Sequence, residues 1–308
     1  MQTVGQLLNY SRRGFNSTVA LVAKDQPKQW NRLAKSVSTE EQFYRVSQYS
    51  GYGQSSIVTE GAPFPQDSRV VAGSIDVYPF MWGNGFGYTA QAKAADFYNL
   101  ISKSAADIAK GHMDTKEMIV ANIFNRAFNS SYTGPDSLEL CSTSHTAATG
   151  ALGGNTQSNY GDGSASLALS TANVETMIVQ MRKRKDHRGL RSPIREKLRL
   201  CVPPDLEPLA YRICKSTAIQ GSANNDVNYI RAGSASLEPE TFYQFTSTTA
   251  FFILPQSLDA LQTYVLNRIP LRTESDYDKR NWTFFYNLGE EIATYWEDWR
   301  AVQGSPGT

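Results

Sequence analysis

Apolar and polar positions divide the chain into an irregular start, a β-rich section, a helical section and a mixed remainder. Residues 1–35 carry only weak amphipathic patches and no strong caps, so they predict an arm with short helical pieces. Residues 41–49 alternate partly, which is typical of a strand. Residues 57–59 and 69–78 are the expected limbs of a hairpin, and residues 60–67 supply its turn.

A long helical pattern without proline follows the hairpin. Apolar side chains recur at helical spacing over residues 90–110, and Gly111 is expected to end that segment. Asp114 and Glu117 then approximate a capping box, after which one apolar face continues to Phe128. The pattern predicts either one helix with a break or two helices nearly in line.

Loops, helices and strands alternate in the remainder of the chain. Residues 130–169 are rich in Gly, Ser, Thr and Asn and predict a long loop. Ser170 is placed to cap a helix that Gly189 closes, and residues 205–216 predict a further helix. Strands are expected at residues 197–202, 243–254, 282–286 and, as a strand or a short helix, 292–302.

Composition narrows the class of protein without indicating a function. The chain has 308 residues, a net charge of +1, 41% hydrophobic and 19% charged residues, which indicates a folded protein with no global attraction to nucleic acid or membrane. No run approaches the roughly 20 apolar residues of a membrane span. Three sparse cysteines predict no disulfide framework and fit a reducing compartment.

Candidate catalytic chemistry is sparse, and we expect no catalytic residue, no metal and no cofactor. The chain has no phosphate-binding loop and no zinc-ligand spacing, and Gly83, Gly85 and Gly87 fit a flexible loop better than a dinucleotide fingerprint. Cys141 and His145 could form a thiol–imidazole nucleophile, or they could be a loop thiol beside a surface histidine. A cytosolic hydrolase that uses this pair is therefore one candidate.

The strongest charge feature is a basic run at residues 182–199, which holds nine cationic and two acidic residues. Residues 274–298 hold seven acidic and two basic residues. Three interpretations of the basic run stay open. It could contact nucleic acid, it could meet the acidic segment within or between subunits, or it could be a solvated helix end where cations suit the helix dipole.

Six stretches of the chain carry a resemblance to a known family. They are Thr59-Glu60-Gly61, Gly85-Phe86-Gly87-Tyr88-Thr89, Ile123-Phe124-Asn125-Arg126-Ala127-Phe128, the helix start Leu169-Ser170-Thr171-Ala172-Asn173-Val174, the strand, double proline and helix of residues 198–207, and Asn225-Asp226-Val227-Asn228. Together they resemble the HK97-fold major capsid proteins of tailed bacteriophages, in particular the group related to the Mu-like major head subunit. The resemblance covers about residues 43–300, and the basic run after Met181 departs from it.

The resemblance implies an α+β fold of the HK97 type. Residues 1–45 would be an N-terminal arm, residues 46–88 an extended β-hairpin loop across a neighbouring subunit, residues 89–137 and 271–308 a peripheral domain with a spine helix, and residues 138–270 an axial domain. An exposed hairpin edge needs a partner to cover it, which agrees with such a loop. The candidate subunit contacts are Glu60, Phe64, Asp67, Arg69, Arg182, Arg184 and Arg188.

The same resemblance implies a virion protein that is not an enzyme. Its copies would assemble in the host cytoplasm, as hexamers and pentamers, into an icosahedral shell around non-specifically bound double-stranded DNA. Portal, scaffolding and decoration proteins would be further partners, and no membrane is implied. Since the chain starts at Met1 without an acidic leader, we expect no long cleaved prodomain. An encapsulin-like protein nanocompartment of the same fold and a β-rich tail or decoration protein are two more candidates.

Overall fold

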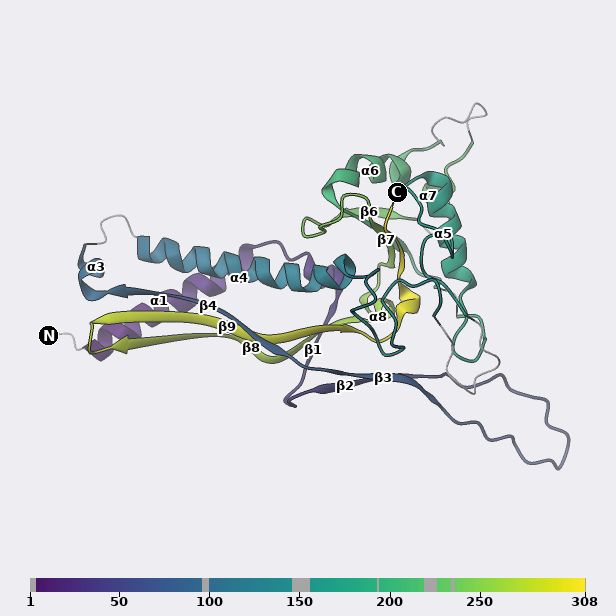
Figure 1. Cartoon of the computed structure of the whole chain (residues 1–308), viewed down its shortest axis with the longest axis horizontal. Coiled ribbons are helices and arrows are strands. Elements are labelled where there is room, and N and C mark those ends of the chain that lie inside the picture. Colours follow the sequence, from purple (N-terminus) through teal and green to yellow (C-terminus); the bar gives the residue numbers. More distant parts are fainter. Residues whose placement is uncertain are drawn as a thin grey trace.

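The computed structural model describes residues 4–95, 100–145, 156–192, 194–218, 226–233 and 236–307. The chain forms an elongated half, in which two long helices lie along a β-sheet, and a smaller α/β half at the other end (Figure 1). A long loop projects outward from the region where the two halves meet (Figure 1). No helix within these ranges is both long enough and apolar enough to cross a membrane.

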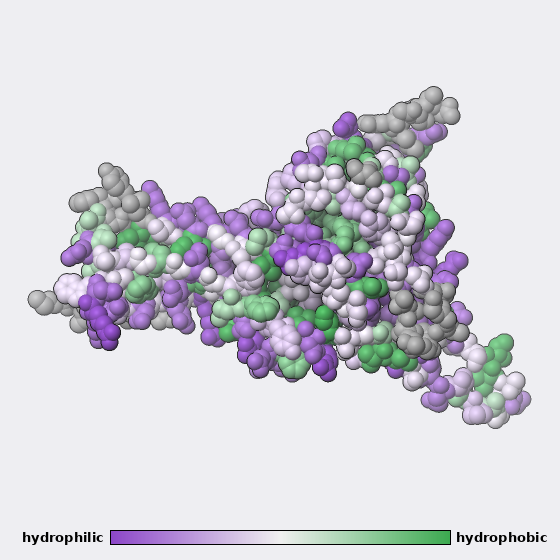
Figure 2. Space-filling view, viewed as in Figure 1, coloured by the Kyte–Doolittle hydropathy of each residue, from purple (hydrophilic) through white to green (hydrophobic). Residues whose placement is uncertain are grey.

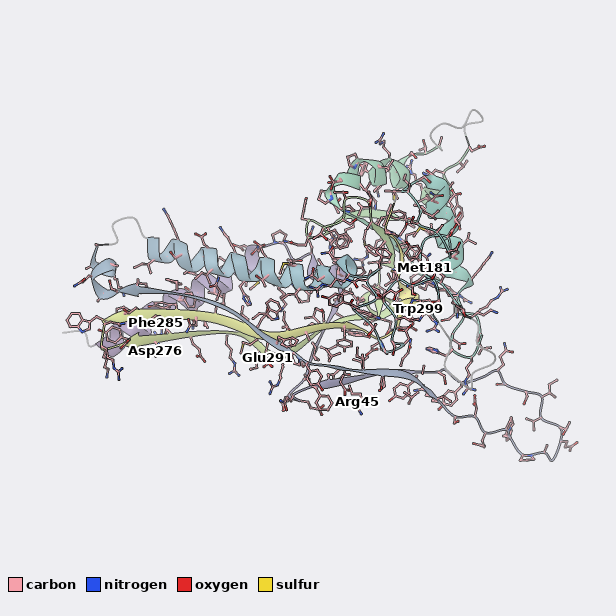
Figure 3. All side chains as sticks on the ribbon, viewed as in Figure 1. Arg45, Met181, Asp276, Phe285, Glu291 and Trp299 are labelled. Carbon is pink, nitrogen blue, oxygen red and sulfur yellow. The ribbon has the colours of Figure 1, made fainter. Side chains whose placement is uncertain are left out.

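A four-stranded sheet in the order β1-β8-β9-β4 forms the floor of the elongated half. β1 (Lys35–Ser38) runs parallel to β8 (Thr263–Asp278), whereas β9 (Thr283–Trp296) is antiparallel to both β8 and β4 (Phe80–Thr89). Alternate side chains of β9, such as Tyr286, are buried under the two long helices. Phe285 and Asp276 lie near the far end of the β8–β9 hairpin (Figure 3).

The expectation of short helical pieces at the N-terminus is wrong, because Val4–Asp25 form one helix, α1. Phe15 and Val19 lie four residues apart on this helix and are buried against the sheet. Tertiary packing of such a face stabilises a helix whose local sequence signals are weak. A short helix, α2 (Trp30–Leu33), leads from α1 to β1.

The long predicted helix is α4 (Leu100–Asn125), and it runs through Gly111 without a break. An interior glycine costs about 1 kcal/mol relative to alanine. Ala109 and His112 on either side of it are buried, so packing outweighs that cost. Before α4, Ala90–Ala94 form the short helix α3, and residues 96–99 of the predicted helix lie outside the described residues.

The predicted capping box within α4 is also wrong, because its two acids bind the N-terminal segment instead. Asp114 accepts a hydrogen bond from Gln26 Nε2 at 2.8 Å. Glu117 accepts hydrogen bonds from the backbone N–H groups of Gln29 (2.9 Å) and Trp30 (2.6 Å). These bonds fix the path of the chain between α1 and α2.

A hairpin is present, but its first limb is β2 (Tyr44–Tyr49) and not the predicted residues 57–59, and its loop is longer than expected. β2 confirms the strand expected at residues 41–49, and it pairs antiparallel with β3 (Val71–Val77). Residues 57–59 form no strand, so that limb of the prediction is wrong. The chain from residue 50 to 70 is instead a loop that turns at Glu60 and Gly61, where the φ of Gly61 is +79°.

Gly83, Gly85 and Gly87 lie within β4 and not in a flexible loop. They occupy the face of the sheet that points away from the helices, where Gly289 and Asn287 are among their β9 partners. A Cβ on Gly85 would stand 2.3 Å from Asn287 Oδ1 and 2.9 Å from the carbonyl oxygen of Tyr286, so a side chain there requires these neighbours to shift. One face of the sheet therefore carries a glycine strip.

The smaller half is built on a second sheet in the order β10-β7-β5-β6. Its strands are β5 (Leu198–Val202), β6 (Glu238–Thr241), β7 (Phe251–Pro255) and β10 (Gln303–Ser305). Its helices are α5 (Thr171–Lys183), α6 (Glu207–Lys215) after the 3-10 turn Pro204–Leu206, α7 (Tyr229–Ala232) and α8 (Leu258–Leu261). The predicted cap is confirmed, since Ser170 accepts a hydrogen bond from the backbone N–H of Asn173, although α5 ends before Gly189.

Other expectations for this half are confirmed in part. The predicted long loop at 130–169 holds no helix or named strand in its described parts, and residues 146–155 lie outside them. The predicted strand 243–254 is a strand only from Phe251, because Phe245 turns into the core before it. The strand predicted at residues 282–286 is the start of β9, which begins at Thr283, continues to Trp296 and is followed by the 3-10 turn Trp299–Ala301.

One apolar cluster joins the two halves. It combines Phe124 of α4, Phe252 of β7, Leu140 of the long loop and Trp299 near the end of the chain. A second cluster around Met181 fills the smaller half, and Figure 3 shows Trp299 just below Met181 in the lower part of this half. The chain passes from β9 through Trp299 into β10, so its last strand binds the two halves together.

Candidate subunit interface

The thiol–imidazole pair expected as a nucleophile does not form. Cys141 is 1% exposed, and burial raises the pKa of its thiol well above the usual range. His145 is buried as well and binds Asp136 Oδ2 through Nδ1 (2.6 Å) and Asn159 Oδ1 through Nε2 (3.0 Å). Its ring stacks on Trp299 at 3.9 Å between centroids. His145 is therefore neither a catalytic base for Cys141 nor a surface histidine; it is a structural residue of the core.

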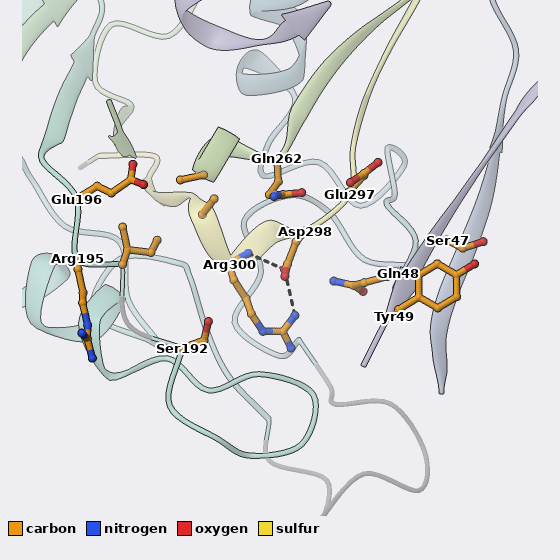
Figure 4. Close-up of a pocket in the computed structure, with 13 residues that line it drawn as sticks. Ser47, Gln48, Tyr49, Ser192, Arg195, Glu196, Gln262, Glu297, Asp298 and Arg300 are labelled. Carbon is orange, nitrogen blue, oxygen red and sulfur yellow. Dashed lines mark hydrogen bonds and ion pairs between the residues drawn. The ribbon is translucent and has the colours of Figure 1, made fainter. Parts of the chain in front are cut away.

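A polar pocket of about 560 Å³ lies between β2, the basic run and the end of β9 (Figure 4). Arg300 donates to Asp298 Oδ1 at 3.0 Å, and burial raises the pKa of Glu297. Among the described residues, no hydroxyl group that lines this pocket is hydrogen-bonded to a carboxylate or an imidazole, so the pocket contains no activated hydroxyl nucleophile. The part of the chain that the structure describes also contains no group of three acidic, histidine or cysteine side chains that could hold a metal ion.

Arg184, a candidate interface residue, lies inside the subunit. Its guanidinium donates to the carbonyl oxygens of Arg300 and Val302 and to the side chain of Gln303. Burial lowers its pKa. Its charge predicted a position on the surface, but backbone carbonyls of the C-terminal segment surround it.

Two other cations of the basic run are also bound within the chain. Arg188 pairs with Asp67 Oδ1 (3.0 Å) and Arg199 with Glu240 Oε2 (3.3 Å). No ion pair joins the basic run to residues 274–298 among the described residues. The basic run is therefore less strongly charged at the surface than its sequence indicates.

Asp67 and Arg69, predicted as subunit contacts, organise the base of the loop. Asp67 accepts a hydrogen bond from the backbone N–H of Gly53 (2.6 Å), and this bond, together with Arg188, holds the pKa of its carboxyl below the usual range. Arg69 lies over the ring of Tyr52. The remaining candidate, Arg182, donates to Tyr229 Oη at 3.1 Å.

The tip of the loop, which contains Glu60 and Phe64, makes few contacts with its own chain. Ile57 is 97% exposed and Phe64 is 79% exposed. Figure 2 shows this tip projecting beyond the body of the molecule, with apolar side chains beside polar ones. Apolar side chains on so thin a projection have no core of their own chain to enter, so the tip is a candidate contact surface for another molecule.

An apolar groove of about 330 Å³ opens between α4 and the sheet, a feature that no local sequence pattern predicted. Its floor includes Trp82, Trp296 and Ile123, and its rim includes Tyr78 and Phe80, which is 66% exposed. These residues come from strand β4, the segment before it, helix α4 and strand β9. Only the fold brings them together, and the one local signal was the aromatic density of residues 78–88.

Comparison with known families and structures gives concordant results. The family model described as "Phage capsid protein" matches residues 75–304. No curated protein matches the chain. The family match covers most of the sheet of the elongated half, all of α4 and almost all of the smaller half.

Solved shell structures share the fold. The capsid of the cyanophage P-SCSP1u matches with a TM-score of 0.58 at 9% identity, covering 90% of this chain and 87% of that chain. The mature capsid of bacteriophage PhiM1 matches with a TM-score of 0.57 at 9% identity, covering 91% and 86%. A virus-like particle from Pyrococcus furiosus matches with a TM-score of 0.53 at 9% identity, covering 94% and 96%. The predicted α+β fold of the HK97 type is confirmed, whereas the Mu-like subgroup stays a prediction.

Proposed function

Because the chain belongs to the phage capsid protein family, we propose that it is a major capsid protein whose copies assemble as hexamers and pentamers into an icosahedral head around double-stranded DNA. The loop at residues 50–70 carries this proposal. It projects from the body, exposes Ile57 and Phe64, and leaves most of its backbone without strand partners in the same chain. A neighbouring subunit supplies what the loop lacks.

In this proposal the elongated half is the peripheral domain and the smaller half is the axial domain around the capsomer centre. The chain is a structural component of the virion, assembled in the host cytoplasm, and not an enzyme. Lys183, Arg191, Arg195 and Lys197 are exposed and supply cations for non-specific contact with phosphates. Portal, scaffolding and decoration proteins are further partners.

Electron microscopy with light scattering on the purified full-length chain tests the proposal. We expect closed shells or rings of five and six subunits, far larger than the 34.2 kDa of one chain. A sample that stays monodisperse at the mass of one chain, from low to high salt and with a crowding agent, contradicts the proposal. The loop would then not be an intermolecular contact.

A nanocompartment shell is the second candidate, because the fold is shared by a particle described as virus-like, from Pyrococcus furiosus, as well as by phage capsids. The contents of particles isolated from their natural source separate the two functions. A head yields long double-stranded DNA that resists nuclease until the shell is opened. A nanocompartment yields a cargo protein and no protected DNA.

A further inference from the structure

We propose that the loop tip of a second copy of this chain docks on the apolar groove between α4 and the sheet, with Phe64 inside the groove and Glu60 beside Arg126. This inference rests on the proposed assembly of the chain and names the surface that receives the loop. It pairs two surfaces of the same chain, the loop tip and the groove, that both expose apolar side chains in the isolated subunit.

The groove is apolar at its base and aromatic at its rim. Trp82 and Trp296 extend from neighbouring strands, and Ile119 and Ile123 of α4 close the opposite side. Tyr78 and Phe80 at the rim are each more than half exposed. A phenyl ring that entered between them would bury its own surface and cover theirs. Buried aromatic side chains of this kind are typical of the centre of a protein–protein interface.

The loop of the same chain cannot fill this groove. At the groove, Val77 is the last residue of β3 and Tyr78 follows it, whereas the loop precedes the start of that strand at Val71. A strand of this length spans roughly 20 Å. The β2–β3 ladder thus separates the loop from the groove, and Figure 1 shows the loop continuing away from α4. The occupant must come from another molecule.

Charge complementarity favours a second copy over an unrelated partner. Arg126 at the groove is exposed and stacks on Tyr132, with 4.3 Å from its guanidinium carbon to the ring centroid. It takes part in no ion pair within the described ranges, and the same holds for Glu60 on the loop tip. The loop turn thus presents one carboxylate close to Phe64, and the groove presents one cation close to its apolar floor.

Charge reversal on the full-length chain tests the pairing, with the critical concentration for shell assembly as the readout. We expect Glu60→Arg and Arg126→Glu each to raise this concentration about ten-fold, and the double variant to return it to within about two-fold of the wild type. Phe64→Ala should raise it by a similar factor. Lys215→Glu and Tyr243→Ala are matched controls, since they change an exposed cation and an exposed aromatic residue elsewhere and should leave it unchanged.

The outcomes separate this inference from the proposed function. If the wild-type chain forms no shells or rings, the proposed function fails. If the wild type assembles but the double charge reversal gives no recovery, or Phe64→Ala assembles like Tyr243→Ala, the docking is wrong and the loop tip binds elsewhere. Slowed amide exchange of residues 119–126 in shells relative to free subunits supports the docking independently of any variant, and unchanged exchange there overturns it.

Discussion

Replacing Glu290 by leucine removes the only anion from a buried charge cluster that holds α4 on the sheet in the described structure. Glu290 of β9 accepts a hydrogen bond from Lys116 Nζ at 2.7 Å and lies 3.2 Å from His112 Nε2. The side chains are 4%, 12% and 3% exposed for Glu290, Lys116 and His112. The substitution leaves a buried ammonium group without its counter-ion.

Removal of one partner of a buried ion pair costs about 3–5 kcal/mol, because the remaining charge keeps its desolvation penalty. With a urea m-value of about 3 kcal/mol per M, suited to a chain of this size, the midpoint of urea unfolding should fall by about 1 to 1.7 M. Replacing both partners by apolar groups removes the unpaired charge. Lys116→Met with Glu290→Leu should therefore recover most of the loss.

Urea unfolding of the unassembled chain, followed by far-ultraviolet circular dichroism, measures these midpoints. A midpoint for Glu290→Leu within about 0.2 M of the wild type refutes the reasoning, since the cluster would then contribute no net stability. A double variant less stable than Glu290→Leu refutes it too, because the loss would then come from packing and not from an unpaired charge.

The pH dependence of stability gives a second measure of the same cluster. Burial favours the neutral form of Glu290, but the hydrogen bond with His112 and the charge of Lys116 outweigh it and lower the pKa. The stabilisation by the carboxylate is complete above the ordinary carboxyl pKa of about 4.3 and is lost as the pH falls through the lower folded value. Glu290→Gln should therefore flatten the stability curve below about pH 5.

Three further predictions concern other contacts. Glu117→Ala removes the acceptor of two backbone N–H groups before α2 and should cost about 1–3 kcal/mol, with faster amide exchange at those two positions as the check. Cys141 and the other two cysteines are buried, so a thiol reagent at pH 8 should label none in the folded chain and all three in guanidinium; labelling of Cys141 in the native state would contradict its burial. Gly85→Val places side-chain atoms against Asn287 and should destabilise the chain by about 1–3 kcal/mol, whereas an unchanged melting temperature would show that β4 can shift away.

Local sequence signals were sufficient to predict an element's start or end where a single residue determines the local backbone conformation. Ser170 was predicted to cap α5 because its hydroxyl can bind a nearby backbone N–H group, and it does so. Pro203 ends β5 as expected, and the strand and helix on either side of it are confirmed. The order of arm, loop, long helix and mixed half likewise followed from composition and periodicity.

Elements stabilised by distant contacts could not be predicted in this way. α1 is stabilised by Phe15 and Val19, which pack against the sheet. Its own sequence has only weak amphipathic patches and no strong cap, so a single long helix could not be predicted from it. β8 contains Pro270, a residue that argues against a strand interior, and the ladder accommodates it with register shifts between Ile269 and Arg272. The groove draws its residues from four segments, so only the fold could reveal that part of the candidate interface.

The glycine strip on β4 has a consequence for the mechanics of the sheet. Side chains that face one another across neighbouring strands resist changes in strand twist, and Gly83 opposite Gly289 offers no such pair. The sheet can therefore alter its twist at this strip at a smaller energetic cost than along the aromatic part of β9. In the proposed assembly, subunits meet at different angles in rings of five and of six, and a compliant zone in the middle of the long hairpin would let one sequence fit both without repacking its core.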